Sequence, residues 1–278
     1  FAGAHGELTG LMLMRQYHIK RGDLKRTKVI VPDSAHGTNP ASAAVCGLEI
    51  VEVPSTPEGT IDVTKLEPLL DDTIAGIMMT NPNTLGIFEK EIPKIAELVH
   101  GCGGLLYYDG ANLNPLLGRC RPGDMGFDIM HINLHKTFST PHGGGGPGVG
   151  PICVAEHLVP FLPGHGLFGN SQNEVSAAPF GSAGILPITY GYIRMMGAEG
   201  LTMATKTAIL NANYLAACLK DTYGIVYRGA NGFVGHEMIL ECRKVYEETG
   251  ISENDIAKRL MDYGYHAPTL SFPVHGTL

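Results

Sequence analysis

The first half of the chain alternates between two patterns of apolar and polar positions. Short runs of β-branched or apolar residues, typical of buried strands, are separated by segments whose apolar residues recur at helical spacing. The predicted strands are residues 28–31, 49–53, 74–80 and 105–108, and the predicted helices are residues 6–20, 39–47, 63–70 and 91–100. This alternation indicates a mostly parallel α/β sheet, in which ligands bind beyond the carboxyl ends of the strands.

The second half continues this pattern and then changes character after Tyr223. Ser252 and Asp255 occupy capping-box positions at the start of the last predicted helix. We predict strands at residues 148–155, 236–242 and 269–273, and helices at residues 185–196, 201–219 and 253–263. This change in the sequence pattern predicts a large domain over residues 1–220 and the start of a small C-terminal α/β domain over residues 221–278.

Polar residues gather at the ends of three predicted strands. His36 follows the first strand, Asn81 the third, and Asp109 to Asn112 the fourth. Each of these residues alone is typical of a turn or a helix cap. Because parallel strands end at the same edge of a sheet, together they predict an acid, a histidine and several amides at one site.

Lys136 completes this set. It lies in a strand-like segment, residues 131–138, which precedes a glycine run at residues 143–146. Lysines are usually solvated surface residues, but the flanks of this one are largely apolar. Desolvation lowers the pKa of a semi-buried lysine and makes it a usable nucleophile for Schiff-base chemistry.

A lysine Schiff base in an α/β protein points first to pyridoxal 5'-phosphate (PLP). Asp109 could hold the pyridine nitrogen, His36 could stack on the ring, and Ala111 is small enough to pack on its other face. The glycines that precede the first helix offer a phosphate site, to which His135 could add a donor.

Composition narrows the protein class. The chain has 278 residues, 44% of them hydrophobic, and a net charge of −7, which argues against a general nucleic-acid binder. No apolar run is long enough to span a bilayer. The six cysteines are scattered without a Cys-x-x-Cys pair, which fits a reducing compartment.

The sequence begins at Phe1 without a methionine or a signal segment, and the small unit stops at Leu278, so we expect a chain cut at both ends.

Several segments together resemble one family. They are residues 3–10 (GAHGELTG), 34–40 (SAHGTNP), 108–112 (YDGAN), 121–124 (RPGD), 133–138 (NLHKTF) and 141–146 (PHGGGG). The chain resembles the PLP-dependent glycine decarboxylase, the P-protein of the glycine cleavage system. It is most similar to the second (β) subunit of the two-subunit prokaryotic form.

The resemblance implies a PLP-dependent transferase of fold type I and assigns roles to individual residues. Lys136 would hold PLP covalently, Asp109 would pair with the pyridine nitrogen and His36 would stack on the ring. The remaining implied cofactor contacts are Ala111, His135, Gly3, Ala4 and His5. The implied substrate and channel residues are Thr38, Asn112, His142, Gly143 and Gly144.

The resemblance also implies a reaction and partners. Glycine would form an external aldimine with PLP and lose CO₂, and its aminomethyl group would pass to the lipoyl arm of the H-protein. The family's two-subunit form adds an α subunit (subunit 1), giving a heterotetramer, so we expect this chain alone to be inactive. The expected location is the cytoplasm in a prokaryote or the mitochondrial matrix in a eukaryote.

Three alternatives remain open. Another fold-type I enzyme, such as an aminotransferase or a cysteine desulfurase, would share Lys136 and Asp109 but use an arginine for a larger substrate carboxylate. A metal-binding protein could use His131, His135 and His142, although their context does not preserve a helix face. A non-catalytic binding subunit would not need the set of Lys136, Asp109 and His36.

Overall fold

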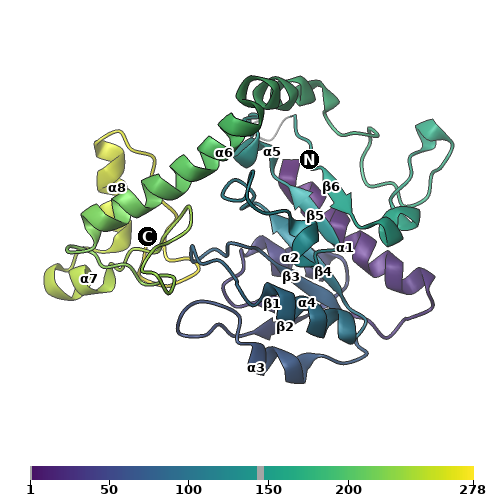
Figure 1. Ribbon diagram of the computed structural model, residues 1–278, viewed down its shortest axis with the longest axis horizontal. Helices are drawn as coiled ribbons and strands as arrows, with labels where there is room; N and C mark the ends of the chain where they lie inside the picture. Colours follow the sequence, from purple (N-terminus) through teal and green to yellow (C-terminus); the bar gives the residue numbers. More distant parts are fainter. Residues whose placement is uncertain (1, 143–146) are drawn as a thin grey trace.

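A computed structural model describes residues 2–142 and 147–278, and a single six-stranded sheet organises it (Figure 1). The strand order is β2-β1-β3-β4-β5-β6, with β6 antiparallel to β5 and the other pairs parallel. The strands are β1 (Lys28–Pro32), β2 (Glu49–Val53), β3 (Ile74–Met79), β4 (Leu105–Gly110), β5 (Ile129–Ile132) and β6 (Ile152–Val154). The predicted α/β class with a mostly parallel sheet is confirmed.

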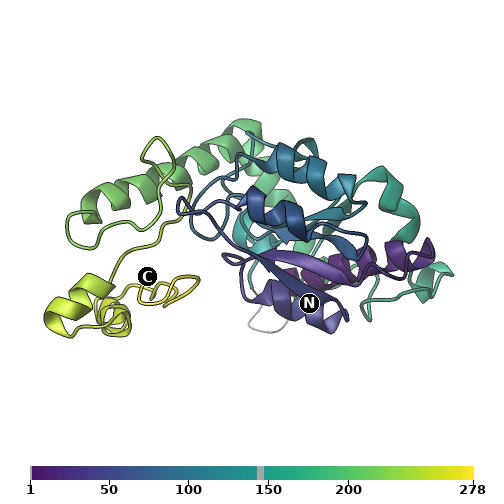
Figure 2. The ribbon, with the colours of Figure 1, turned by 90° about the horizontal axis from the view of Figure 1, so that it is seen from below.

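Helices cover both faces of the sheet, and Figure 2 shows them from a second side. The core on one face contains residues of α1 (Ala2–Lys20) and α2 (Thr38–Val45), and the core on the other contains residues of α3 (Val63–Leu66) and α4 (Ile92–Gly101). The side chains of adjacent strand residues point to opposite faces, so Tyr107 belongs to the first core and Tyr108 to the second. The near-continuous apolar runs of β3 and β4 follow from burial on both faces.

Helix α1 approaches the sheet closely because glycine faces Tyr107. A Cβ atom at Gly10 would lie 2.2 Å from the Tyr107 ring, closer than real contacts allow. The Tyr107 hydroxyl donates to the Glu7 carbonyl of α1 at 3.1 Å. The helix is therefore fixed against β4, the strand that carries Asp109.

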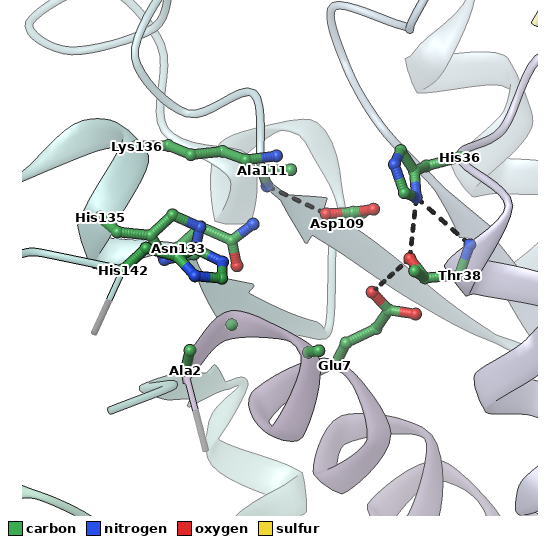
Figure 3. Close-up of a pocket in the computed structure, with 12 residues that line it drawn as sticks. Ala2, Glu7, His36, Thr38, Asp109, Ala111, Asn133, His135, Lys136 and His142 are labelled. Atoms are coloured by element: carbon green, nitrogen blue, oxygen red, sulfur yellow. Dashed lines mark hydrogen bonds between the residues drawn. The ribbon is translucent and has the colours of Figure 1, made fainter. Parts of the chain in front are cut away.

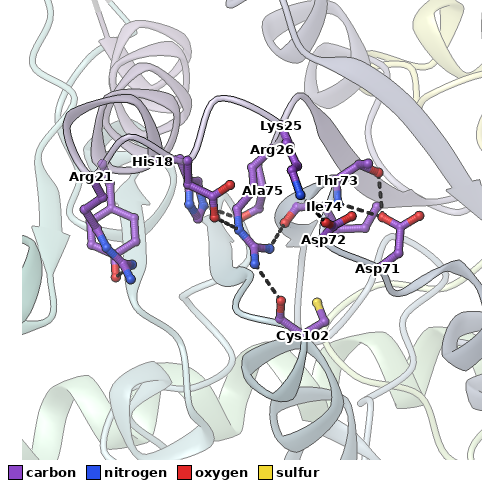
Figure 4. A network of polar contacts seen from close by, with 12 residues as sticks. His18, Arg21, Lys25, Arg26, Asp71, Asp72, Thr73, Ile74, Ala75 and Cys102 are labelled. Atoms are coloured by element: carbon purple, nitrogen blue, oxygen red, sulfur yellow. Dashed lines mark hydrogen bonds and ion pairs between the residues drawn. The ribbon is translucent and has the colours of Figure 1, made fainter.

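The amino-terminal edge of the sheet is tied together by Arg26 (Figure 4). Its guanidinium donates to the Ile74 carbonyl at 2.6 Å, to the Cys102 carbonyl at 2.8 Å and to Asp23 at 2.6 Å. His18 of α1 bonds the Ala75 carbonyl at 2.8 Å. These bonds join α1 and the segment before β1 to β3 and to the turn before β4.

Several predicted boundaries were wrong. The first helix begins at Ala2 rather than near Gly6, so the small residues expected before it form its first turn. Lys136 lies on a one-turn helix, α5 (Leu134–Thr137), rather than on a strand. Residues 236–242 and 269–273 are not strands. The first segment forms only isolated bridges, from Leu240 to Ile225 and from Glu241 to Thr277, and the second forms none.

The long helix α6 (Leu186–Leu219) joins the two predicted helices at residues 185–196 and 201–219. Gly197 interrupts it with a φ of 60°, which glycine adopts at little cost. Among the helices that the structure describes, none is both long and apolar enough to cross a membrane.

After α6 come two shorter helices, α7 (Arg243–Thr249) and α8 (Glu253–Asp262). The predicted capping box of Ser252 and Asp255 is present at α8. A small apolar cluster that includes Leu85, Ile87 and Ile239 joins this part to the loop after β3. The domain division at residue 220 stays a prediction.

We predict that Gly10→Ala destabilises the fold while Gly101→Ala does not. The added Cβ at Gly10 overlaps Tyr107, and overpacking of this kind lowers the free energy of unfolding by about 1–3 kcal/mol. The Cβ at Gly101, the last residue of α4, meets nothing within 4 Å, so stability should be unchanged or raised by up to about 1 kcal/mol. Urea unfolding of both variants measures the difference, and equal stabilities would contradict the packing argument.

Candidate active site

A cavity of about 340 Å³ lies at the carboxyl edge of the sheet (Figure 3). Its walls come from the first turn of α1, the loop after β1, the end of β4 and the segment around α5. The sequence-predicted residues among its lining are Gly3, Ala4, His36, Thr38, Asp109, Ala111, His135, Lys136 and His142. Thus the structure brings together most of the predicted site.

Asp109 is the buried acid of this cavity, with 2% of its surface exposed. Its Oδ1 atom accepts from the Ala111 backbone N–H at 2.9 Å and lies 3.2 Å from Nε2 of His131. Burial alone would raise the Asp109 pKa. The hydrogen bond and charge of His131, the Ala111 N–H and the charge of Lys136 outweigh burial and lower that pKa below its ordinary value. Asp109 is therefore an anion at neutral pH.

His131 continues this arrangement into the core. Its Nδ1 atom lies 3.0 Å from the Tyr107 hydroxyl, and only 1% of the residue is exposed. Burial, followed by the charges of Asp109 and Glu7, raises the pKa of Tyr107 well above its ordinary value, so it stays a neutral hydroxyl. From the sequence, His131 was predicted only as a possible metal ligand. A histidine on the strand beside Asp109 was the signal that could have identified it as the partner of that acid.

Lys136 lines the cavity, but it is not the semi-buried lysine that its apolar flanks predicted. Its side chain is exposed rather than semi-buried, while its neighbours Leu134 and Thr137 are buried. The apolar flanks point into the protein because α5 turns the lysine outward over the cavity. The predicted shielding by those flanks was therefore wrong, although Lys136 does lie at the same edge of the sheet as Asp109, as predicted (Figure 3).

His36 is held by a short chain of hydrogen bonds (Figure 3). The Thr38 backbone N–H donates to Nδ1 of His36 at 3.2 Å, so the neutral ring carries its proton on Nε2. The Thr38 hydroxyl, 3.0 Å from the same Nδ1, donates to Oε2 of Glu7 at 3.0 Å. The His36 ring also packs edge-on against Phe272.

Glu7 is a cavity residue that the sequence analysis missed. It is 4% exposed, and its Oε1 atom has no hydrogen-bond partner among the described residues. Burial, followed by the negative charge of Asp109, raises its pKa. An acid among small residues near a helix start was the available signal.

The first turn of α1 forms another wall. Ala2, Gly3 and Ala4 line the cavity there, and the first backbone N–H groups of a helix have no partners within that helix. A Cβ at Gly3 would overlap the Asn133 side chain, so glycine is required for this close approach. His5 does not line this cavity, and its ring bonds the Val175 carbonyl. Its cofactor contact stays a prediction.

On the far side, the rings of His135 and His142 meet at 4.5 Å between centroids. Burial, followed by the charges of His142 and Lys136, lowers the pKa of His135, which favours the neutral ring. The predicted channel residues Gly143 and Gly144 lie outside the described residues.

A second cavity of about 330 Å³ adjoins the first. The two share four lining residues, His36, Asp109, Ala111 and Lys136. The predicted channel residue Asn112 lines only the second cavity, whereas Thr38 and His142 line only the first. The outer wall of the second cavity comes from the C-terminal part of the chain and includes Glu237, a residue that sequence patterns did not single out.

The three histidines considered as metal ligands do not form one cluster. His131 is engaged with Asp109 inside the core, while His135 and His142 face the cavity. Within residues 2–142 and 147–278, the one group with ligand atoms close enough to share an ion is Glu7, Asp109 and His131.

The residues present fit PLP. An ionised, buried Asp109 suits a protonated pyridine nitrogen, and the start of α1 suits a phosphate. Two buried side-chain oxygens without a hydrogen-bond partner, Glu7 Oε1 and Asn133 Oδ1, belong to residues of this lining and can bond a polar ligand. Lys136 places a primary amine in the same cavity.

Comparisons with known proteins agree with this reading. The model of the aminotransferase class-V family matches residues 12–178, and the model described as the glycine dehydrogenase C-terminal domain matches residues 204–278. The glycine dehydrogenase (decarboxylating) of Bacteroides fragilis is 71% identical over 100% of this chain and 30% of its own length. A Thermosipho africanus protein named "Probable glycine dehydrogenase (decarboxylating) subunit 2" is 54% identical over 98% of this chain and 58% of its own length.

Solved structures show the same fold at low identity. The crystal structure of a glycine decarboxylase (P-protein) in inhibitor-bound form matches this chain with a TM-score of 0.76 at 20% sequence identity. The match covers 100% of this chain and 64% of the other. The Oryza sativa TDC with PLP matches with a TM-score of 0.72 at 14% identity, covering 99% and 61%.

These structural matches confirm the predicted PLP-dependent fold type I. The chain spans 30% to 58% of the length of the two curated relatives described above. It belongs to the class-V aminotransferase family and is a relative of the glycine dehydrogenases (decarboxylating), whose C-terminal domain it shares.

Proposed function

We propose that this chain carries the PLP site of a glycine decarboxylase that releases CO₂ and passes the aminomethyl group to a lipoyl arm on an H-protein. The observation that carries the proposal is the cavity where Lys136 faces the buried anion of Asp109, in a chain 71% identical to a glycine dehydrogenase (decarboxylating). The relative named subunit 2 supports an α-subunit partner within a heterotetramer.

Each residue has a task in this scheme. Lys136 would hold the cofactor through its side-chain amine. Asp109 would keep a proton on the pyridine nitrogen, and the start of α1, with His135, would hold the phosphate. PLP, when bound, supplies the electron sink for the electrons released as CO₂ departs.

His36 and Thr38 orient the ligand. With its proton on Nε2, His36 presents a donor edge while its face is available for stacking. Thr38, fixed between His36 and Glu7, prevents that ring from turning. The lipoyl arm would approach past His142 and the segment that contains Gly143 and Gly144.

Borohydride reduction tests the position of the cofactor. Reduction of the PLP-loaded protein should fix a pyridoxyl group on Lys136, because its amine faces the same cavity as Asp109. Peptide mapping by mass spectrometry locates the label, and a label on any other lysine overturns the assignment. Lys94, an exposed lysine paired with Glu97, is the internal control and should stay unlabelled.

Carboxyl exchange tests the reaction. The protein, with its α partner and a lipoylated carrier, should exchange labelled bicarbonate into the carboxyl group of glycine. Asp109→Ala should retain the label on Lys136 yet lose exchange, since an unprotonated ring is a poor electron sink. Transamination without exchange would favour an aminotransferase instead.

His131→Leu should impair exchange through Asp109. Losing one hydrogen bond to a buried charge corresponds to a roughly ten- to hundredfold loss of rate. Because His131 lowers the pKa of Asp109, the variant should raise that pKa, and the acidic limb of the pH profile should move to higher pH. His131→Gln, whose amide can donate, should restore part of the rate.

The matched control is His100→Leu, which breaks a similar pair, with Asp128 at 2.8 Å, outside both cavities. Its pH profile should match that of the unchanged protein. If His131→Leu and His100→Leu behave alike, His131 acts only through general stability.

A further inference from the structure

The second cavity has an anionic wall that the proposed scheme does not use. Glu237 lines it together with Lys136, and Oε1 of Glu237 accepts from the Asn112 amide at 2.9 Å. Asn112 itself is anchored by a bond to the Pro82 carbonyl at 3.0 Å. A side chain from the C-terminal part of the chain is thereby held at the edge of the sheet, beside the lysine.

The backbone fixes Glu237 in this place. A Cβ at Gly86 would lie 2.2 Å from the Glu237 carbonyl oxygen, so the loop after β3 and the segment of Glu237 touch through backbone atoms. The Gly235 N–H donates to the Gly86 carbonyl at 2.7 Å. Glu237 therefore has little freedom to leave the cavity, although 37% of its side-chain surface is accessible there.

The charges around Glu237 favour a cation as its ligand. The titratable groups that face it are Lys136, His36 and Asp109 across the cavity, with His236 beside it at 3.7 Å. Burial, followed by the charge of Lys136, lowers the pKa of His236 to about 4, so this ring is neutral. Lys136 is the cation whose charge acts on Glu237, and its amine is no longer available to the carboxylate once it holds a cofactor.

We propose that Glu237 binds the ammonium group of the incoming amino acid and accepts its proton, which leaves a neutral, nucleophilic amine beside Lys136. This inference rests on the proposed function. In the step, one N–H bond of the ammonium breaks and an O–H bond forms on the carboxylate, giving a neutral amine and a neutral carboxylic acid. The transfer needs no other reactant.

The chemistry of Glu237 suits this exchange. Burial raises its pKa to about 7, although the Asn112 bond and the charge of Lys136 oppose that rise. A base with a pKa near the working pH can take a proton and return it. Asn112 then has a role distinct from the predicted channel: its amide orients the carboxylate toward the cavity.

The test measures binding instead of turnover. The PLP-loaded protein is first reduced with borohydride, so that amines cannot bond to the cofactor, and methylammonium is titrated by NMR. Its affinity should rise as pH passes through the Glu237 pKa of about 7 and then level off, because the ionised carboxylate binds the cation. Acetate has a carboxylate but no ammonium group. Its affinity should stay the same or rise as the pH falls and Glu237 is neutralised.

Glu237→Gln should weaken methylammonium binding about tenfold above that pKa and flatten its pH dependence, by loss of a charge-assisted bond. Glu237→Asp, which keeps the charge, should retain the pH dependence. Glu248→Gln, at an exposed position on α7, is the matched control and should change neither property.

Two outcomes overturn the inference. One is pH-independent methylammonium binding in the unchanged protein, a result that requires no variant to fold. The other is loss of acetate binding, rather than methylammonium binding, in Glu237→Gln. Because the same reduced sample reports the label on Lys136, a labelled lysine with no effect at Glu237 refutes this inference and leaves the proposed function standing.

Discussion

The arrangement of the site depends on keeping one carboxylate charged inside the protein. Asp109 pays a desolvation penalty that would otherwise neutralise it, and His131 and the Ala111 N–H offset that penalty. The strand register makes this possible, because Asp109 and His131 are direct neighbours on β4 and β5. Gly110 lets the two strands close at this point, since a Cβ there would lie 1.8 Å from the His131 carbonyl oxygen. The register of the sheet thus places the histidine that keeps Asp109 charged.

Much of the fold and part of the site could be predicted from sequence for the same physical reason. Apolar runs buried on both faces identify parallel strands, and parallel strands gather their ends at one edge, so Asp109 and His36 could be assigned to a common site. The position of Lys136 at that edge was predicted correctly, but its exposure to solvent was not predicted. A one-turn helix has too few residues for a periodic pattern, and α5 decides which way the lysine points.

The missed residues share a different property: their partners are far away in sequence. Glu7 bonds Thr38, and His131 bonds Tyr107 and Asp109 across strands, so hydrophobic periodicity reveals none of these contacts. Glu237 bonds Asn112, 125 positions earlier, from a segment predicted as a strand. That segment forms only isolated bridges, since no neighbouring strand continues the ladder. Local periodicity carries no information about such tertiary contacts.

The backbone contact at Gly86 has a consequence for the order of assembly. The cofactor side of the site is built from residues 2–142, whereas the opposite chamber is completed only when the segment around Glu237 docks through Gly86. All the described residues that line the first cavity are therefore synthesised before Glu237, and the second cavity gains its outer wall last.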